Sequence, residues 1–245
     1  MTRRARSLVA LAALGVLGAV LVVAVTGLEP FGHYPGPYGD VLAKVVPDER
    51  HTGQLVAATV FDYRAFDTLG EEMILFAAVC GCAALLRVLR SEHAGEGAPG
   101  RPVPSFAARA MAAALVGPVT VLGVYVIVHG HLTPGGGFSG GVVVAGALLL
   151  AYAGGQGLRL RRVGSITLLE GTEALGAAGF LALALAGLIA AGTLLKNFLA
   201  LGTSGMLLSA GTIPVGNVAV GLEVVGAVAL VFAEFLEQAL LEDPE

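Results

Sequence analysis

The most evident deficit in the sequence is charge. Of its 245 residues only 13% are charged, whereas 56% are hydrophobic, and a soluble domain usually carries about a quarter charged residues. The charges are clustered, which leaves long neutral stretches. Because about 20 mostly apolar residues are enough to cross the hydrocarbon of a bilayer, the composition predicts an integral membrane protein. The net charge of −4 and the lack of a basic patch give no indication of nucleic-acid binding.

Cysteine is also scarce. Cys80 and Cys82 are the two cysteines of the sequence, in AVCGCAA. In a helix they point to nearly opposite faces, and they are too close in sequence for an unstrained disulfide there. We interpret them as small packing residues. The sequence has no CxxC pair that could ligate an iron–sulfur cluster, and we expect neither a cofactor nor a catalytic activity of the chain itself.

Six apolar segments are long enough to cross a membrane. They cover about residues 8–28, 69–89, 107–128, 138–157, 172–195 and 215–236. The first follows MTRRAR, but its uncharged run is longer than that of a usual signal peptide and no clear cleavage site follows, so we predict a retained anchor. The sequence thus predicts an all-α integral membrane protein with six transmembrane helices.

The positions of the basic residues predict the orientation. With the N-terminus in the cytoplasm, ten of the 14 basic residues lie on the cytoplasmic side. The remaining four, on the outside, are Lys44, Arg50, Arg64 and Lys196. We therefore predict an N-in/C-in, multi-pass protein of the cell inner (cytoplasmic) membrane, in contact with the lipid bilayer.

A polar segment rich in glycine and proline divides the chain. Residues 91–105 are predicted to be a cytoplasmic linker between a two-helix part, 1–90, and a four-helix part, 106–245. The longest predicted non-spanning piece is 29–66. Its stretch QLVAATVFDYRAF is apolar and β-branched enough for a strand or for an interfacial element, and both alternatives remain open.

Residues 129–141 read HGHLTPGGGFSGG and join the third and fourth predicted spans. The pairs Gly136/Gly140 and Gly137/Gly141 have the spacing at which small residues allow close helix packing. Irregular backbone at membrane depth is tolerated only where protein or water covers it. We therefore predict a tight packing hairpin that is buried against other helices. Its residues are Pro134, Gly135, Gly136, Gly137, Phe138, Gly140 and Gly141.

The histidines of the hairpin allow several interpretations. The glycines do not form a phosphate-binding loop, because the GxxxxGK[ST] pattern is missing. For His129 and His131 the sequence supplies no further metal ligands at a recognisable spacing, so we expect no metal site. His131 can serve a proton or cation route, since histidine titrates near physiological pH. An interfacial histidine in a packed turn is the alternative.

The carboxylate of Glu223 is the strongest functional candidate. It lies near the middle of the sixth predicted span, at a depth where a charge costs several kcal/mol. At about 100° per residue, Glu234 and Glu237 lie on the same stripe, and we interpret these two as solvated charges at the helix end. Asn217, about one and a half turns before Glu223, can hydrate or hydrogen-bond the outer half of the span.

A second acidic group, FDYRAFDTLGEE at 61–72, lies at the outer mouth of the second predicted span. Asp67, Glu71 and Glu72 are its candidates. The sequence Thr68-x-x-Glu71 also fits a capping box, in which Glu71 caps the helix; Glu72 is not needed for that cap.

Two further candidates belong to the fifth predicted span. Thr167-x-x-Glu170 is another possible capping box, with Glu173 one turn further on, and for this segment a cap and a function remain equal alternatives. Lys196 lies near the outer end of the span. It either shifts the pKa of nearby carboxylates or extends to the interface.

Two sets of motifs resemble one known family. HGHLTPGGGFSGG, VVVAGALLLAY and GTIPVGNVAVGLEV resemble the MnhB subunit of the Mrp (Mnh) multisubunit cation/proton antiporters, over about residues 106–237. FDYRAFDTLGEE resembles the DFRGFDTLGE signature at the C-terminal end of the large MnhA subunit of those complexes, over about residues 54–90. It resembles equally the small subunit with that signature in related membrane-bound hydrogenases.

The resemblance implies a complex of several membrane subunits, related to the membrane arm of respiratory complex I, that exchanges Na⁺ or another monovalent cation for H⁺. It carries over Glu71 and the hairpin at 131–141. Two features depart from the family: both parts share one chain, and Glu71 is followed by a second glutamate where an apolar residue is expected.

We therefore expect a noncatalytic subunit of an Mrp-type Na⁺/H⁺ antiporter, bound to other membrane subunits and helping to form the cation and proton pathway. The alternatives are a subunit of the ion-translocating module of a redox-driven complex, such as a membrane-bound hydrogenase, and a passive scaffold. The pathway candidates are Glu71, Glu72, Asp67, His131, Glu173, Lys196, Asn217 and Glu223.

Overall fold

The computed structural model describes residues 3–28, 32, 37–92, 104–155 and 165–239. Every regular element in these residues is helical, so the prediction of an all-α protein is confirmed for them. The predicted linker, 91–105, lies largely outside the described residues. The chain divides into two compact units, residues 1–41 and 42–245.

The first unit contains helix α1, Arg3–Thr26. Within it, residues Leu11–Thr26 form an apolar helix of the described chain. Helix α2, Tyr38–Arg50, begins in the first unit and continues into the second, where Leu42 and Val46 are buried.

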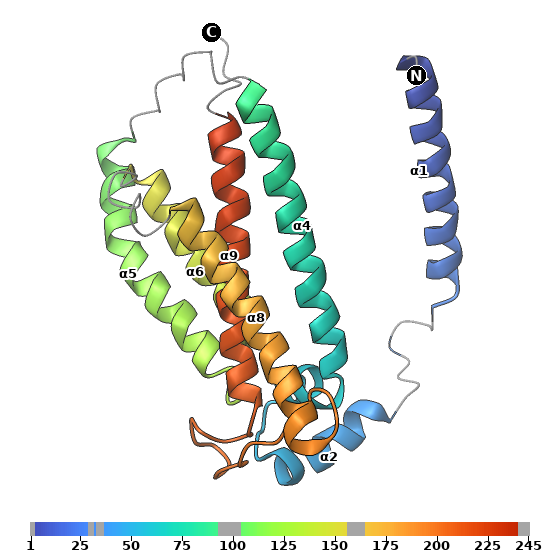
Figure 1. The fold of residues 1–245 in the computed structure, drawn as a ribbon, viewed down its shortest axis with the longest axis vertical. Coiled ribbons are helices and arrows are strands. Elements are labelled where there is room, and N and C mark those ends of the chain that lie inside the picture. Colours follow the sequence, from blue (N-terminus) through green and yellow to red (C-terminus); the bar gives the residue numbers. More distant parts are fainter. Residues whose placement is uncertain (1–2, 29–31, 33–36, 93–103, 156–164, 240–245) are drawn as a thin grey trace. The chain divides into compact units, whose positions relative to one another are not determined.

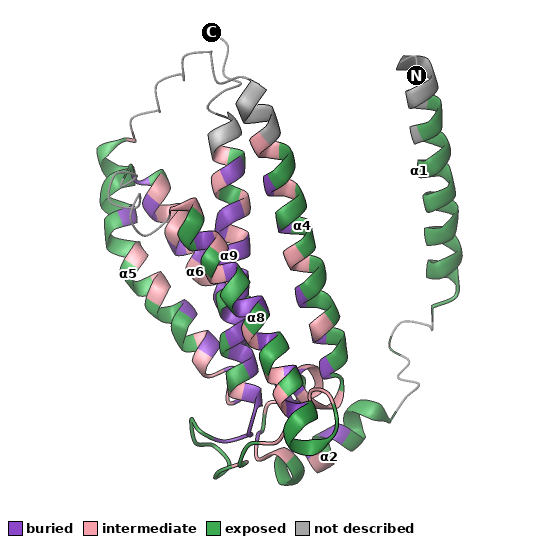
Figure 2. Ribbon diagram, viewed as in Figure 1, coloured by how far each residue is buried: buried purple, intermediate pink, exposed green. Residues whose placement is uncertain are grey.

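Five longer helices make up most of the second unit (Figure 1). They are α4 (Ala65–Glu92), α5 (Phe106–Val128), α6 (Gly137–Ala153), α8 (Ile166–Ala191) and α9 (Ile213–Ala239). Helix α9 packs against the other four. Figure 2 accordingly shows buried residues along much of α9, whereas α4 and α5 have long exposed faces.

Four of the described helices are long and apolar enough to cross a membrane, in the segments Ala65–Arg87, Phe106–Val128, Ile166–Ala191 and Ile213–Leu236. The apolar helices Leu11–Thr26 and Gly137–Ala153 are shorter. The six-span topology and its orientation therefore stay predictions.

The helix bundle has a hairpin end and an arginine end. At the hairpin end, α5 is joined to α6 through residues 129–136, and α4 and α9 begin. At the arginine end, α4 carries Arg87, α8 begins, and α9 reaches Glu234.

The segment 54–66 is helical, so the strand alternative is wrong. Leu55–Ala58 form the short helix α3 and Thr59–Tyr63 the π-helix η1, directly before α4. The Phe61 ring meets that of Phe180 on α8 edge to face, with 6.1 Å between centroids. The packing of Phe61 explains the difference, because it holds the segment against the helical bundle.

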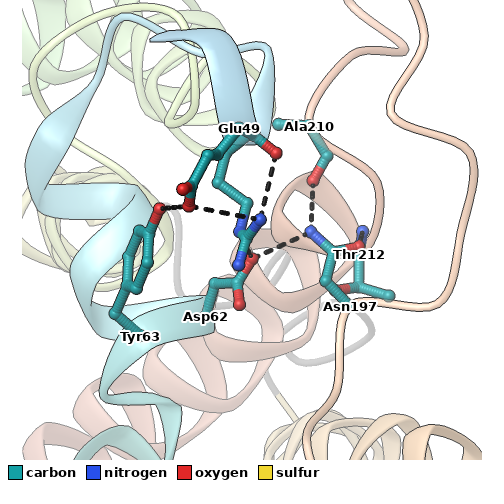
Figure 3. Close-up of polar contacts among 7 residues, drawn as sticks. Glu49, Asp62, Tyr63, Asn197, Ala210 and Thr212 are labelled. Atoms are coloured by element: carbon teal, nitrogen blue, oxygen red, sulfur yellow. Dashed lines mark hydrogen bonds and ion pairs between the residues drawn. The ribbon is translucent and has the colours of Figure 1, made fainter. Parts of the chain in front are cut away.

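A cluster of polar contacts fixes this segment at the hairpin end (Figure 3). Arg50 pairs with Asp62 at 2.5 Å, and the amide of Asn197 donates to Asp62 at 3.2 Å. The Tyr63 hydroxyl donates to Glu49 at 2.7 Å; burial, together with this bond, raises the pKa of Tyr63 to about 12. The cluster joins α2 and η1 to the loop between α8 and α9.

The capping-box alternatives for Glu71 and Glu170 are wrong, because α4 and α8 each begin earlier than the motif requires. Helix α8 is capped by Ser165, whose side chain accepts from the backbone nitrogen of Leu168. Helix α4 begins at Ala65, and the Thr68 hydroxyl donates to the carbonyl of Val60 at 2.6 Å. Neither Glu71 nor Glu170 is therefore needed to explain a helix start.

The helical glycines of the predicted packing hairpin lie in close contact with neighbouring helices. Gly137, Gly140 and Gly141 are buried, and a Cβ atom at Gly140 would lie 2.6 Å from the carbonyl oxygen of Gly123 on α5. Gly136 is also buried, whereas Pro134, Gly135 and Phe138 are exposed. The hairpin is therefore buried in part: its helical glycines pack against neighbouring helices, whereas Pro134, Gly135 and Phe138 stay accessible.

Candidate functional site

Four carboxylates are buried where α4, α8 and α9 pack together. Glu72 on α4 and Glu173 on α8 each expose 2% of their surface, and Glu223 and Glu234 on α9 expose none. Burying a lone charge at membrane depth costs several kcal/mol. Each of these groups therefore needs a proton, a cation or a hydrogen-bond donor.

Glu72 on α4 and Glu223 on α9 lie close enough for their carboxyl groups to interact electrostatically. Among the described residues, neither oxygen of Glu223 has a hydrogen-bond donor, and Glu72 Oε2 also lacks one. Ionised carboxylates can only accept hydrogen bonds, so two of them bond to each other only when one carries a proton. The arrangement can thus hold a proton, and its free oxygens are also the ligand type that hard cations prefer.

Glu173 extends this group along the interface between α8 and α9. Its carboxyl interacts electrostatically with those of Glu223 and Glu170. The two helix backbones touch at this level, because a Cβ atom at Gly176 would lie 2.6 Å from the Cα atom of Glu223. Glu173 Oε1 has no hydrogen-bond partner among the described residues.

At the arginine end the carboxylates are paired. Arg87 on α4 binds Glu170 on α8 with Nη2 at 2.7 Å and Glu234 on α9 with Nε at 2.8 Å. The interpretation of Glu234 as a solvated helix-end charge is therefore wrong: α4 covers that face of α9 and supplies the counter-charge. The side chain of Glu237 lies outside the described residues.

An apolar cluster lies along the same helices between the central carboxylates and Arg87. It includes Val79 on α4, Leu169 on α8, and Ala227 and Leu230 on α9. Glu223 and Glu234 are about 16 Å apart along α9, at about 1.5 Å per residue. On α9, apolar side chains thus lie between Glu223 and Glu234, whereas on α8 Glu173 and Glu170 are only about one turn apart.

A cavity of about 210 Å³ borders the central group at the hairpin end. Its lining includes Thr68, Glu71, Glu72, Asn217 and the backbone of Gly135–Gly137. Since one water occupies about 30 Å³ in the liquid, the cavity has room for several. A hydrated ion or a water chain can therefore approach Glu72 from this end.

Not all predicted candidates belong to this group. Asp67 is exposed and forms an ion pair with Arg64. Lys196 is exposed in the loop that follows α8. Glu71 is exposed but lines the cavity, so the second glutamate of the doublet, Glu72, is the one that faces the other carboxylates.

Asn217 is fully buried and holds the hairpin in place. Its side-chain oxygen accepts from the backbone nitrogen of Gly137 at 2.9 Å, and its amide donates to the carbonyl of Ile213 at 3.2 Å. Both bonds are to backbone, so the amide connects the start of α6 to the start of α9.

His131 is fully buried within the hairpin. Its carbonyl accepts from the Thr52 hydroxyl, and its Nε2 lies 3.4 Å from the carbonyl of Met206. Burial lowers the pKa of the imidazole, which favours the neutral form at neutral pH. These contacts agree with a packed turn.

Arg87 is a site residue that was not predicted from the sequence, where the basic residues indicated only the orientation. A helical pattern could have revealed it. Val79 and Ala83 are buried on α4, and Arg87 follows Ala83 at the same four-residue spacing, so it continues their face.

Long apolar helices that bury carboxylates between them are characteristic of membrane proteins that handle ions or protons. Residues 107–230 match the family described as a domain related to the MnhB subunit of Na⁺/H⁺ antiporters. The chain belongs to this family, which confirms the resemblance to the MnhB subunit.

A relative of known sequence is the uncharacterized protein MJ1307 of Methanocaldococcus jannaschii. It is 33% identical over 214 residues, which cover 76% of this chain and 79% of the relative.

Two solved structures have a similar fold. A chain of the membrane-bound sulfane sulfur reductase, an archaeal respiratory membrane complex, is 28% identical with a TM-score of 0.69, over 94% of this chain and 98% of that one. A chain of the Mrp complex from Dietzia sp. DQ12-45-1b is 24% identical with a TM-score of 0.64, over 96% of this chain and 26% of that one. The joined layout of this chain thus matches nearly a whole chain of the archaeal complex.

Proposed function

We propose that the chain is a noncatalytic subunit of a multisubunit membrane complex that exchanges a monovalent cation, Na⁺ in the first instance, for protons. Membership of the MnhB-related family and the likeness to chains of two membrane complexes support this proposal. The single observation that carries it is the buried pair of Glu72 and Glu223, whose free oxygens have no protein donor among the described residues.

The pair works as a site for alternate occupancy. Bringing two negative charges together in a buried site is costly, so the pair takes up either a proton or a metal cation. Loading one expels the other, since each neutralises the same charge. This competition is the elementary step of an exchange between a cation and a proton.

The order of the carboxylates defines the route. An ion enters the cavity beside Glu72 at the hairpin end, reaches Glu223, and passes to Glu173 on α8. Glu170 and Glu234 receive it at the arginine end. The excess of arginines at that end supports a cytoplasmic location for it. In the proposed complex, other membrane subunits and lipid cover the exposed faces of α4 and α5.

A redox-driven complex is the second candidate for the parent assembly. The specific observation in its favour is coverage: the likeness to the sulfane sulfur reductase chain extends over 98% of that chain, against 26% of the Mrp chain. In that case the same pathway is driven by electron transfer in partner subunits. Purification in a mild detergent distinguishes the two, because co-purifying iron–sulfur subunits identify a redox-driven complex.

The test of the proposed function is Glu223→Gln in the assembled complex. Glutamine keeps the size of the side chain but cannot ionise, so we expect normal assembly on native gels and loss of most cation-dependent proton flux in everted vesicles. Asp48→Asn, at an exposed carboxylate of α2, is the matched control and keeps the parental flux.

The glutamate doublet provides a second comparison. Glu72→Gln removes the inward carboxylate and Glu71→Gln the exposed one, so the loss of flux at Glu72 exceeds that at Glu71 severalfold. An assembled Glu223→Gln complex with parental flux makes the carboxylate structural and favours a passive scaffold.

A further inference from the structure

Arg87 occupies the exit of the carboxylate route at the arginine end. Its guanidinium binds Glu170 on α8 and Glu234 on α9 through two different nitrogens, at 2.7 Å and 2.8 Å. We infer that Arg87 is a gate: its guanidinium occupies the carboxylates that a translocated cation must reach, and it moves aside to let the cation pass. This inference rests on the proposed function.

The exposed fractions of the side chains of Arg87, Glu170 and Glu234 indicate where the gate lies. The side chain of Glu234 is fully buried, whereas those of Arg87 and Glu170 are 39% and 41% exposed. The guanidinium therefore lies at the boundary, with a buried carboxylate behind it and an accessible one beside it. A cation that leaves the bundle along α9 meets Glu234 first and the guanidinium next.

The chemistry of arginine suits this position. A guanidinium does not lose its proton in proteins, so it is a permanent cation that competes with a metal ion for the same oxygens. Its planar fork lets one side chain bind carboxylates from two helices. Because the side chain is partly exposed, it has room to swing outward when an incoming ion neutralises Glu234.

The apolar cluster behind the gate supports the same conclusion. Val79, Leu169 and Leu230 belong to one packed cluster along the segment between Glu223 and Glu234, so the arginine end is closed on the α9 side by packed side chains as well as by the guanidinium. If Arg87 only held three helices together, its partner would not need to be a buried carboxylate in the proposed route. The two roles are separable, because a fastener affects assembly and a gate affects leakage.

The first experiment measures passive ion leakage. The parental complex and Arg87→Gln, Arg87→Lys and Arg109→Gln complexes are reconstituted into proteoliposomes, and ²²Na⁺ efflux is followed without a proton gradient. Arg87→Gln raises the efflux severalfold, and Arg87→Lys gives an intermediate rate, because an ammonium keeps the charge but not the fork. Arg109 is an exposed arginine of α5, and its variant leaks like the parent. An assembled Arg87→Gln complex that is as tight as the parent overturns the gate.

The second experiment measures access and does not depend on transport. In a background with Cys80→Ala and Cys82→Ala, Leu230→Cys places a thiol one turn before Glu234, at a buried position. A cationic methanethiosulfonate added from the arginine end labels this thiol in Arg87→Gln and not in the presence of Arg87. Equal labelling with and without Arg87 refutes the gate.

The two proposals can fail separately. Should Glu223→Gln leave transport intact, the proposed route fails, whereas the dependence of labelling on Arg87 is still decided. If Arg87→Gln does not assemble, Arg87→Lys replaces it in both experiments. An assembled Arg87→Lys complex that leaks and is labelled like the parent overturns the inference.

Discussion

A Cβ atom added at Gly176 on α8 would lie 2.6 Å from the Cα atom of Glu223 on α9. The absence of a side chain at Gly176 therefore fixes how closely the two helices approach, and with it the position of the central carboxylates. Small residues have this role in many membrane helix pairs, because they let backbones come into contact.

The first prediction follows from this contact. Gly176→Ala forces α8 and α9 apart, and overpacking of this kind costs about 1–3 kcal/mol. We expect the midpoint of thermal unfolding in detergent to fall by about 2–4 °C per kcal/mol, together with a loss of flux. Gly171→Ala is the control on the same helix, where an added Cβ meets nothing within 4 Å. Equal midpoints for the two variants would contradict the close approach.

The second prediction concerns the hairpin. Gly140→Leu places a branched side chain where a Cβ already meets Gly123 and Ile127 of α5, so α6 cannot pack and the complex is lost on native gels. Gly146→Leu, on the same helix with open space around its Cβ, leaves the complex intact. Assembly of both variants would show that α6 does not depend on the glycine contact.

The third prediction is a pH dependence caused by His131. Burial lowers the pKa of His131 in the folded chain below the ordinary value of 6.5. At a pH between these two pKa values, the unfolded chain therefore binds more protons than the folded one. Stability therefore rises with pH through this window and falls on acidification below 6.5. His131→Asn weakens this acid-side loss, measured as thermal midpoints at neutral pH and at about pH 5. The control is His129→Asn, at a half-buried position of the same hairpin, which keeps the acid-side loss of stability. If the thermal midpoint of His131→Asn changes with pH as much as that of the parent, other groups cause the loss.

The fourth prediction tests the topology. In a chain without Cys80 and Cys82, single cysteines at Ala107 and Pro134, both exposed and near opposite ends of α5, are labelled by an impermeant reagent from opposite sides of the membrane. On the orientation predicted from the arginine distribution, the cysteine at Pro134 is the one labelled from outside. Labelling of both from one side would discard this arrangement of α5.

The sequence was sufficient for the features that depend on composition and local spacing. The scarcity of charge and the lengths of the apolar runs predicted helices suited to a membrane, and the spacing of Gly136, Gly137, Gly140 and Gly141 predicted close packing. The isolated carboxylate of Glu223 stood out for the same reason, since a charge in an apolar run has few explanations other than function.

Local motifs were less reliable at helix starts. The threonine and glutamate of each supposed capping box have the right spacing, but α4 and α8 begin earlier, at Ala65 and Ile166. Packing of Phe61 on Phe180 and the cap at Ser165 decide where these helices begin. A spacing rule contains no information about such contacts.

The sequence by itself determined that this chain is helical, apolar and rich in small residues at one hairpin, because these properties follow from the order of residues along one segment. Only the tertiary structure decided which charges meet. Glu72 faces Glu223 across two helices, and Glu234 is buried because Arg87 of α4 covers it. These pairs join positions 147 to 151 residues apart. Such contacts depend on the rotation of each helix relative to its neighbours. This rotation is fixed by the packing of the whole bundle and is not encoded in any single segment.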